Sequence, residues 1–218
     1  MKKILVRVIL LFTTLAVSLS AHADWRFGLH ASYDNTGASV MYGGEKGGTR
    51  NISGFSVGPV VAYEFLDYLS VQTGVDFLMN GFATLDKSMI LDVPYEVEDV
   101  LRLYYLQVPL YAVGQLPIRN EEATLLLEVG PNFACGVGDE IISTLHASGI
   151  TPIEESQSNV AFDNVLSRFN VSMHVGIGAE YMGARLMVGY NFGLYNLSLV
   201  EDTKINSGGF TLSVGYMF

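Results

Sequence analysis

The feature that most constrains this chain is a repeated alternation of large apolar residues with small or polar ones. In a β-strand a period of two sends these two sets of side chains to opposite faces. The segments with this pattern are 25–33, 54–65, 69–80, 104–115, 124–137, 169–181, 184–195 and 209–218. The pattern predicts an all-β chain of eight strands.

Charged residues inside these segments indicate which face is which. All of them share the parity opposite the large aromatic residues: Arg26, Glu64, Asp76, Glu128, Glu180 and Arg185. A basic side chain at the lipid-facing midplane of a barrel costs about 2–4 kcal/mol, and an acidic one somewhat less. The aromatic parity is therefore predicted to face lipid, and the charged parity to face the lumen of a transmembrane barrel.

A soluble barrel with its aromatic side chains inside is the alternative arrangement. It would present to water a surface made largely of glycine, serine and asparagine. Charged residues make up only 16% of the chain, whereas a soluble surface carries roughly 25–35%. The composition therefore favours the membrane barrel.

The connections between the segments alternate in length. Those at 66–68, 118–123 and 182–183 are short, and those at 34–52, 83–102, 138–167 and 197–207 are long. Outer-membrane barrels have short periplasmic turns and longer outer loops. We therefore predict an eight-stranded antiparallel up-and-down transmembrane β-barrel in the outer membrane, with acidic outer loops and a mobile piece at 151–159.

The lumen of so narrow a barrel is expected to be filled by side chains, without an open pore. Its parity is rich in glycine, which makes room for four large residues, Tyr105, Tyr111, Met187 and Tyr195. Prolines inside the predicted strands donate no ladder hydrogen bond, so bulges are expected at Pro59, Pro109 and Pro131.

The first 23 residues have the features of a secretory signal peptide. Basic residues precede an apolar run, and Ala21-His22-Ala23 supplies a cleavage site. The expected division is a signal peptide at 1–23 and an outer-membrane β-barrel domain at 24–218. No other apolar run approaches the ~18–20 residues of a transmembrane helix. The single cysteine, Cys135, is predicted to face lipid and cannot form an internal disulfide.

The chain is acidic, and removal of the leader would make it more so. Its formal net charge of −10 would become −13, because the leader contains three basic residues and no acidic one. Nucleic acid is a poor partner for such a chain. The expected partners are outer-membrane lipid and lipopolysaccharide, the barrel-insertion machinery, and an unidentified envelope protein.

The last ten residues form an apolar strand that ends on an aromatic residue. One face of it carries Phe210, Leu212, Val214, Tyr216 and Phe218. The last strand of a closed barrel must pair with the first. The ending also resembles the C-terminal signature of Gram-negative outer-membrane barrels, and this resemblance implies that the insertion machinery reads it as a membrane-insertion signal.

Short motifs along the chain resemble the PorT-like outer-membrane β-barrel family. They are Val57-Gly58-Pro59 with Tyr63-Glu64-Phe65, Leu69-Ser70-Val71-Gln72-Thr73-Gly74, Tyr105-Leu106-Gln107-Val108-Pro109-Leu110, Gly130-Pro131, Gly176-Ile177-Gly178-Ala179-Glu180-Tyr181 and the terminal strand. The resemblance spans nearly the whole chain after the leader. It implies an eight-stranded barrel without enzyme chemistry, and it includes members tied to protein secretion.

The lumen charges are the first candidate for a functional site. A two-residue turn at 182–183 would place Glu180 opposite Arg185. Arg26 should lie near Glu64, because both sit at the periplasmic ends of adjacent strands. With Asp76 and Glu128, the set contains four acids and two arginines, which is an excess of two negative charges. Two interpretations stay open: a salt-bridge network that fills the barrel and fixes its register, and a cation or proton site.

A second candidate consists of His30, Ser32 and Asp34 near the outer end of the first strand. Such groups could serve an acyl hydrolase or transferase at the outer rim. The alternative interpretation is that they are only neighbours on one face of the strand and have no catalytic role. His174 with Ser172 is a weaker pair. The spacing of a zinc site and a phosphate-binding loop are both absent. We therefore assign no catalytic, cofactor-binding or metal-binding residue.

The expected function is structural or interactive: an envelope scaffold whose loops contact lipopolysaccharide or a protein partner, within a secretion or envelope assembly. The acids of one predicted outer loop, Asp92, Glu96, Glu98 and Asp99, are interpreted as solvated loop charge. They could instead hold divalent cations shared with lipopolysaccharide phosphates or face a basic partner. An enzyme acting on lipid or peptide at the outer rim is the alternative function, and a narrow channel is a third.

Overall fold

A computed structural model describes residues 24–90, 93–118, 123–147 and 152–218, so the expected signal peptide lies outside the described residues. The fold is all-β, and no helix in these ranges is long and apolar enough to span a membrane. The strands are β1 (Asp24–Tyr42), β2 (Glu45–Lys46), β3 (Thr49–Leu66), β4 (Leu69–Gly74), β5 (Asp76–Ile90), β6 (Val93–Ile118), β7 (Ala123–Ala147), β8 (Ile153–Ser158), β9 (Phe169–Tyr181), β10 (Ala184–Gly193) and β11 (Thr203–Met217).

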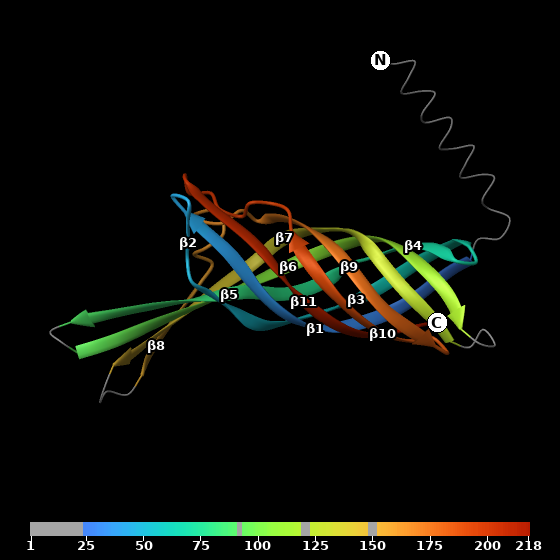
Figure 1. Cartoon of the computed structure of the whole chain (residues 1–218), viewed down its shortest axis with the longest axis horizontal. Coiled ribbons are helices and arrows are strands. Elements are labelled where there is room, and N and C mark those ends of the chain that lie inside the picture. The colour runs from blue at the N-terminus through green and yellow to red at the C-terminus, as the bar shows by residue number, and fades with distance from the viewer. Residues whose placement is uncertain (1–23, 91–92, 119–122, 148–151) are drawn as a thin grey trace, which may run out of the picture.

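The strands close into an antiparallel ring (Figure 1). The order around it is β1, β3, β4 with β5, β6, β7, β9, β10 and β11, and β11 pairs back onto β1. β4 and β5 act as one strand, because both keep the same register against β3 and β6 and are separated only at Val75. The predicted eight-stranded up-and-down barrel is confirmed.

Cross-strand pairing shows how strongly the ring is sheared. The pairs can be followed once around the barrel through Trp25, Tyr63, Val71, Ala112, Val129, Val175, Tyr190, Phe210 and Asn35. The path returns to β1 ten residues beyond its starting point, and such a stagger requires strands tilted against the barrel axis. Side chains at one height in the lumen therefore come from strand positions that the pairing alone does not align.

The two parities face opposite sides, as predicted. On the outer surface Trp25 is 63% exposed and Phe27 56% exposed, whereas Asp76 and Glu128 in the lumen are 2% and 5% exposed. Cys135 lies on the outer parity and is exposed. The predicted lumen residue Tyr195 is the exception. It follows the end of β10, is 39% exposed, and packs its ring against Phe169 with centroids 5.7 Å apart.

Most of three predicted outer loops is paired strand instead. β5 and β6 form a hairpin that stays in register out to Ile90 and Val93, and β6 pairs with β7 as far as Tyr95 and Ala147. β8, inside the piece expected to be mobile, pairs with β7. The prediction of loops was wrong here because these segments contain β-branched residues such as Val97, Val100, Ile141 and Ile142, which favour strands, and they keep forming ladder hydrogen bonds beyond the predicted strands.

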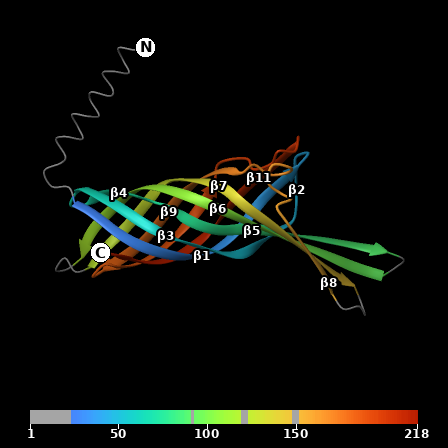
Figure 2. The ribbon, with the colours of Figure 1, turned by 180° about the vertical axis from the view of Figure 1, so that it is seen from behind.

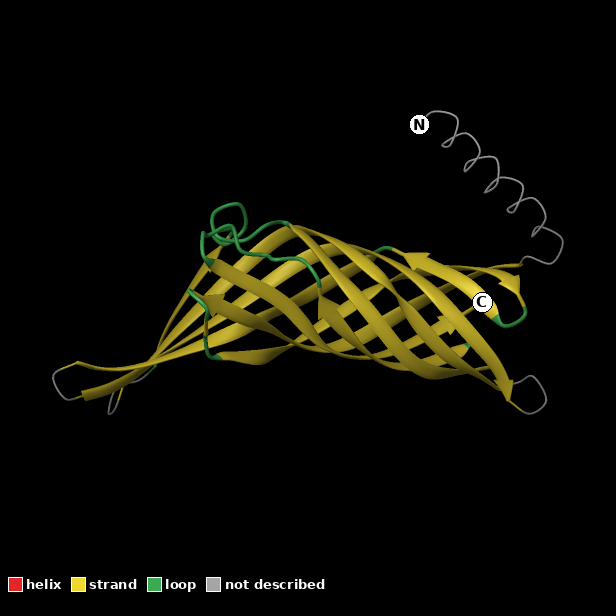
Figure 3. Cartoon of the chain, turned by 45° about the horizontal axis from the view of Figure 1, so that its top comes forward, coloured by secondary structure: helices red, strands yellow, loops and turns green. Residues whose placement is uncertain are grey.

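These extensions build a four-stranded sheet, β5–β6–β7–β8, beyond the barrel. Figures 1 and 2 show it projecting at the end opposite the C-terminus, and Figure 3 shows most of the loops gathered at that same end. By the general rule for outer-membrane barrels, the end with short turns is periplasmic and this end is outside. We refer to β5–β8 beyond the barrel as the outer sheet.

The predicted bulges at Pro59, Pro109 and Pro131 are wrong. Pro59 and Pro109 flank the gap between β4 and β5, and Pro131 lies at a gap in the β6–β7 ladder, yet the register is unchanged across both gaps. Proline lacks the N–H group, so it interrupts the ladder without inserting a residue. Register shifts occur instead between Asn51 and Phe55, Glu64 and Leu66, and Tyr104 and Tyr105.

Candidate functional site

An ionic layer fills the lumen at its periplasmic end. Arg26 Nη1 donates to Glu64 Oε1 at 3.1 Å and its Nη2 donates to Glu180 Oε1 at 2.5 Å. Arg185 Nε donates to Glu180 Oε2 at 2.5 Å, and its Nη1 donates to Gln72 Oε1 at 2.6 Å. The predicted neighbours Arg26 with Glu64 and Glu180 with Arg185 are confirmed. The contact between Arg26 and Glu180 was not predicted, because β1 and β9 are not adjacent in the ring.

Neutral side chains complete this layer. Gln115 Nε2 donates to Glu64 Oε1 at 3.2 Å and to Ser70 Oγ at 3.0 Å. Both Gln115 and Ser70 are buried. The layer therefore joins β1, β3, β4, β6, β9 and β10 through side chains that cross the lumen. It has the form of a plug rather than a set of isolated surface ion pairs.

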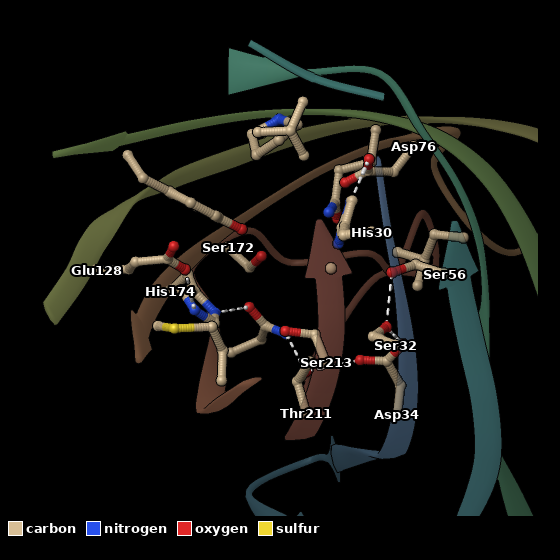
Figure 4. Close-up of a pocket in the computed structure, with 18 of the residues that line it drawn as sticks. His30, Ser32, Asp34, Ser56, Asp76, Glu128, Ser172, His174, Thr211 and Ser213 are labelled. Carbon is tan, nitrogen blue, oxygen red and sulfur yellow. Dashed lines mark hydrogen bonds and ion pairs between the residues drawn. The ribbon is translucent and has the colours of Figure 1, made fainter. Parts of the chain in front are cut away.

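A cavity of about 100 Å³, with polar and apolar side chains in its wall, lies in the lumen beyond the ionic layer. Figure 4 shows Glu128 and His174 on one side of it and His30 and Asp76 on another. His30 Nε2 lies 2.8 Å from Asp76 Oδ1, whereas His174 Nε2 lies 3.9 Å from Glu128 Oε2. Asp76 and Glu128 were predicted to face the lumen, but sequence reasoning did not identify either histidine as a neighbour of these acids.

Other polar groups line the same cavity. Asp34 accepts hydrogen bonds from Ser32 Oγ and Thr211 Oγ1, both at 2.6 Å. Tyr111 Oη donates to Asn132 Oδ1 at 2.6 Å, and the Tyr111 ring stacks on His174 with centroids 4.8 Å apart. The cavity wall thus combines carboxylates and hydroxyls with one aromatic face.

An apolar lid closes the outer side of the lumen. The lid consists of Ala161, Phe162, Leu166 and Leu197, which lie in the segments that follow β8 and β10. These residues form one buried cluster with side chains of the barrel strands, namely Leu78, Phe82, Leu103, Tyr105, Ala134 and Ile205. The ring of Phe162 meets that of Tyr105 edge-on with centroids 5.5 Å apart. Gly136 permits this packing, because a Cβ atom there would collide with the Phe162 ring.

One buried carboxylate holds the lid segment in place. Asp139 Oδ1 accepts hydrogen bonds from the backbone N–H groups of Val160 and Ala161 at 2.9 and 2.8 Å, and Oδ2 accepts one from Phe162 at 3.1 Å. Arg168 stacks over the Phe162 ring at 5.4 Å and donates to the Gly136 carbonyl at 3.2 Å. Sequence reasoning missed Asp139, which it treated as an ordinary loop acid.

Comparisons with known proteins agree with this architecture. A family model described as "Outer membrane protein beta-barrel domain" matches residues 18–199. The chain belongs to this outer-membrane β-barrel family. No curated protein matches the chain.

The chain is similar to several solved structures. They include Ail, the attachment invasion locus protein of Yersinia pestis, solved with the heparin analogue sucrose octasulfate (18% identity over 88% of this chain and 99% of Ail, TM-score 0.36). OprG of Pseudomonas aeruginosa matches at 15% identity over 90% of this chain and 95% of its own, with a TM-score of 0.46. Neisserial surface protein A matches at 12% identity over 90% and 99%, with a TM-score of 0.36.

Family membership places the protein in the outer membrane, as predicted. The lipid-facing parity described above is therefore its membrane surface. On β11 this surface includes Phe210, Leu212, Val214 and Tyr216, whose strand pairs with β1, and Phe218 N donates to the Phe27 carbonyl at 2.7 Å. The C-terminal strand thus closes the barrel.

The structure separates the second group of candidate residues into different pairs. His30, Ser32 and Asp34 lie within β1 and inside the lumen rather than near the outer rim, because β1 continues to Tyr42. Ser32 bonds to Asp34 and to Ser56, while His30 bonds to Asp76. Within the described residues no hydrogen bond joins Ser32 to His30, so the arrangement lacks the contact that activates a serine nucleophile.

Proposed function

We propose that this outer-membrane barrel has a structural and interaction role in the cell envelope, and that its outer sheet is the surface that meets a protein partner. The observation that carries this proposal is the outer sheet itself. It extends paired strands beyond the barrel and ends in two open edges. A sheet edge presents unpaired N–H and C=O groups, to which an extended segment of another protein can add as a further strand.

Each edge can be located from the pairing. β8 pairs with β7 alone among the described strands, and all its side chains are exposed. On the opposite side β3 pairs with β5 only as far as Thr49 and Thr84, so Leu85–Ile90 has β6 as its sole described neighbour. The open edges therefore lie at both sides of the same sheet, outside the membrane.

The charge of the outer sheet suggests which partners it would accept. Some acids are already paired across strands, as Arg50 Nη1 with Glu98 Oε1 at 3.1 Å and Arg102 Nη1 with Glu140 Oε2 at 3.4 Å. Glu154 and Glu155 on the β8 edge are exposed. A partner strand with basic residues would complement this edge. Of the acids considered for lipopolysaccharide contact, Asp92 lies outside the described residues.

The lumen supports a scaffold rather than a pore. The ionic layer occupies its periplasmic end and the apolar lid its outer end. As part of the proposal, Arg26, Glu64, Glu180 and Arg185 fix the barrel's register and seal it, and no residue is given a catalytic role.

The proposal also covers export of the protein and its insertion into the outer membrane. Residues 1–23 would be removed as a signal peptide, leaving 24–218 as one barrel domain. The lipid-facing residues of β11 would be read by the insertion machinery. The motif resemblance to PorT-like barrels supports membership of that narrower group, with a partner in secretion or envelope assembly.

A site-specific crosslinking experiment tests the interaction surface. A photoreactive amino acid is placed at Ser156 in β8 or at Tyr68, which is exposed at the periplasmic turn, and whole cells are irradiated before mass spectrometry. We expect one dominant envelope protein attached at 156 and not at 68. An absence of protein adducts at 156 while the barrel remains folded would refute the proposed surface.

A further inference from the structure

Negative charge exceeds positive charge around the lumen cavity. Asp34, Asp76 and Glu128 all line it and are all buried, and the one arginine in its wall is Arg185. Arg185 pairs with Glu180 through Nε, and its buried Nη2 has no hydrogen-bond partner among the described residues. A buried charge without a counter-charge is strongly unfavourable. The cavity therefore requires a positive charge, a proton, or both.

Glu128 is the acid that most lacks a partner. Asp34 has two hydroxyl donors and Asp76 has His30, but no hydrogen bond within the described residues reaches the Glu128 carboxylate. Its nearest basic group, His174 Nε2, is 3.9 Å away, which is too far for a hydrogen bond. A carboxylate that is 5% exposed normally accepts several hydrogen bonds.

Two further acceptors in the cavity wall also lack donors. Asn80 Oδ1 and Asn170 Oδ1 are buried without a hydrogen-bond partner, and both residues are more than nine-tenths buried. They come from β5 and β9, and Asn170 pairs with Ala134, six residues along β7 from Glu128, so it lies toward the outer end of the cavity. Near the middle of the lumen, the unpaired Glu128 carboxylate is the group that matches a ligand with N–H donors and a positive charge.

The remaining wall favours an organic cation over a metal ion. The rings of Tyr111 and His174 stack beside Glu128, and an aromatic face attracts ammonium groups. No group of three potential metal ligands from His, Cys, Asp and Glu occurs among the described residues. The cavity of about 100 Å³ is several times larger than one water molecule needs, so it has room for a small cation.

We propose that this cavity binds a small primary ammonium ion, with Glu128 as its counter-ion. The N–H groups of the ion donate to the Glu128 carboxylate. The volume admits ammonium, methylammonium and ethylammonium. Tetramethylammonium should not bind in this way, because it has no N–H group to donate to Glu128. This site is independent of the outer sheet and its partner.

The experiment measures binding to the folded barrel in detergent micelles by isothermal titration calorimetry, after long equilibration because both ends of the lumen are closed. Methylammonium chloride is the probe, and sodium chloride of equal concentration is the salt control. We expect binding in the millimolar range that weakens at least about tenfold in Glu128→Gln, since that variant loses a charge-assisted hydrogen bond. Glu155→Gln removes an equal charge from exposed β8 and should bind as the native protein does.

A series of cations with and without N–H groups, measured on the native protein, keeps the test decisive if Glu128→Gln does not fold. Ammonium and methylammonium should bind, and tetramethylammonium should not. Equal binding of sodium or tetramethylammonium, or no binding of methylammonium, would overturn the proposal. Unchanged methylammonium binding in a folded Glu128→Gln variant would overturn it as well, and would indicate that Glu128 carries a proton instead of a counter-ion.

Discussion

Replacing Asp139 by asparagine should release the lid without unfolding the barrel. Asp139 Oδ1 and Oδ2 together accept three backbone hydrogen bonds from Val160, Ala161 and Phe162, at 2.9, 2.8 and 3.1 Å. Asparagine keeps one oxygen of nearly the same shape, so two of these bonds survive as weaker neutral ones. The third acceptor becomes an NH₂ group, which faces the Phe162 N–H and leaves that buried donor without a partner.

The magnitude follows from these three bonds. A hydrogen bond to a charged group contributes about 1.5–3 kcal/mol, a neutral one about 0.5–1.5, and a buried unsatisfied donor costs about 1–3. Two weakened bonds and one lost bond then lower the local stability of the lid by about 3 kcal/mol, allowing for relaxation. At about 1.4 kcal/mol per factor of ten, opening of the lid becomes about 100-fold more frequent.

Hydrogen–deuterium exchange of the folded barrel in detergent measures this opening directly. The amides of Ala161 and Phe162 should exchange about 100-fold faster in Asp139→Asn, while amides of β9 and β10 in the barrel wall keep their native protection. Asp67→Asn is the control, because Asp67 is an exposed acid in the turn between β3 and β4, away from the lid. Unchanged protection at Ala161 and Phe162, or equal loss throughout the barrel, would refute the reasoning.

Three further predictions concern the rest of the lumen. Arg185→Met leaves Glu180 with one of its two arginine partners and should lower the free energy of unfolding in urea by about 3–5 kcal/mol. The control Arg50→Met removes a pair with Glu98 in which Arg50 is 63% exposed, and it should change this free energy by less than about 1 kcal/mol; similar losses would contradict the ionic layer. Gly136→Ala should displace the Phe162 ring and speed its amide exchange, while Gly138→Ala, whose Cβ atom would meet Asn159 and Tyr104 only at ordinary van der Waals distances of 3.8 and 3.9 Å, should not. Native-like exchange in both would count against the lid packing. The native barrel in a planar bilayer should carry no steady current, and a reproducible ohmic conductance would contradict a lumen closed at both ends.

The sequence was sufficient to predict the barrel and the direction of its faces. Alternation decides both because one misplaced charge on the lipid side is costly, so Asp76 and Glu128 had to face inward. The contacts of Glu180 with Arg185 and of Arg26 with Glu64 were also predictable, since each pair sits on adjacent strands near a short turn. Such pairs depend only on local register.

Contacts across the lumen were not predictable in the same way. Arg26 reaches Glu180, and His30 reaches Asp76, from strands that are not neighbours in the ring. Which side chains share a height depends on the shear, and the shear emerges only when all the pairings are known. Tyr195 was misplaced for a related reason: its parity is correct, but the strand ends at Gly193, after which parity has no meaning.

A single strand, β7, connects the three parts of the molecule that the proposals concern. It carries Glu128 in the cavity, Gly136 beneath the lid ring and Asp139 as the anchor of the lid, and it then continues into the outer sheet, where it pairs with β8. Asp139 is itself adjacent to this pairing, because its backbone carbonyl accepts a hydrogen bond from Asn159 at 3.0 Å. Substitutions in β7 beyond Asp139 would therefore disturb the lid and the outer sheet together. β8 forms the edge of the outer sheet and pairs with β7 alone among the described strands. The crosslinking position lies there, at Ser156, because a partner strand would add beside it.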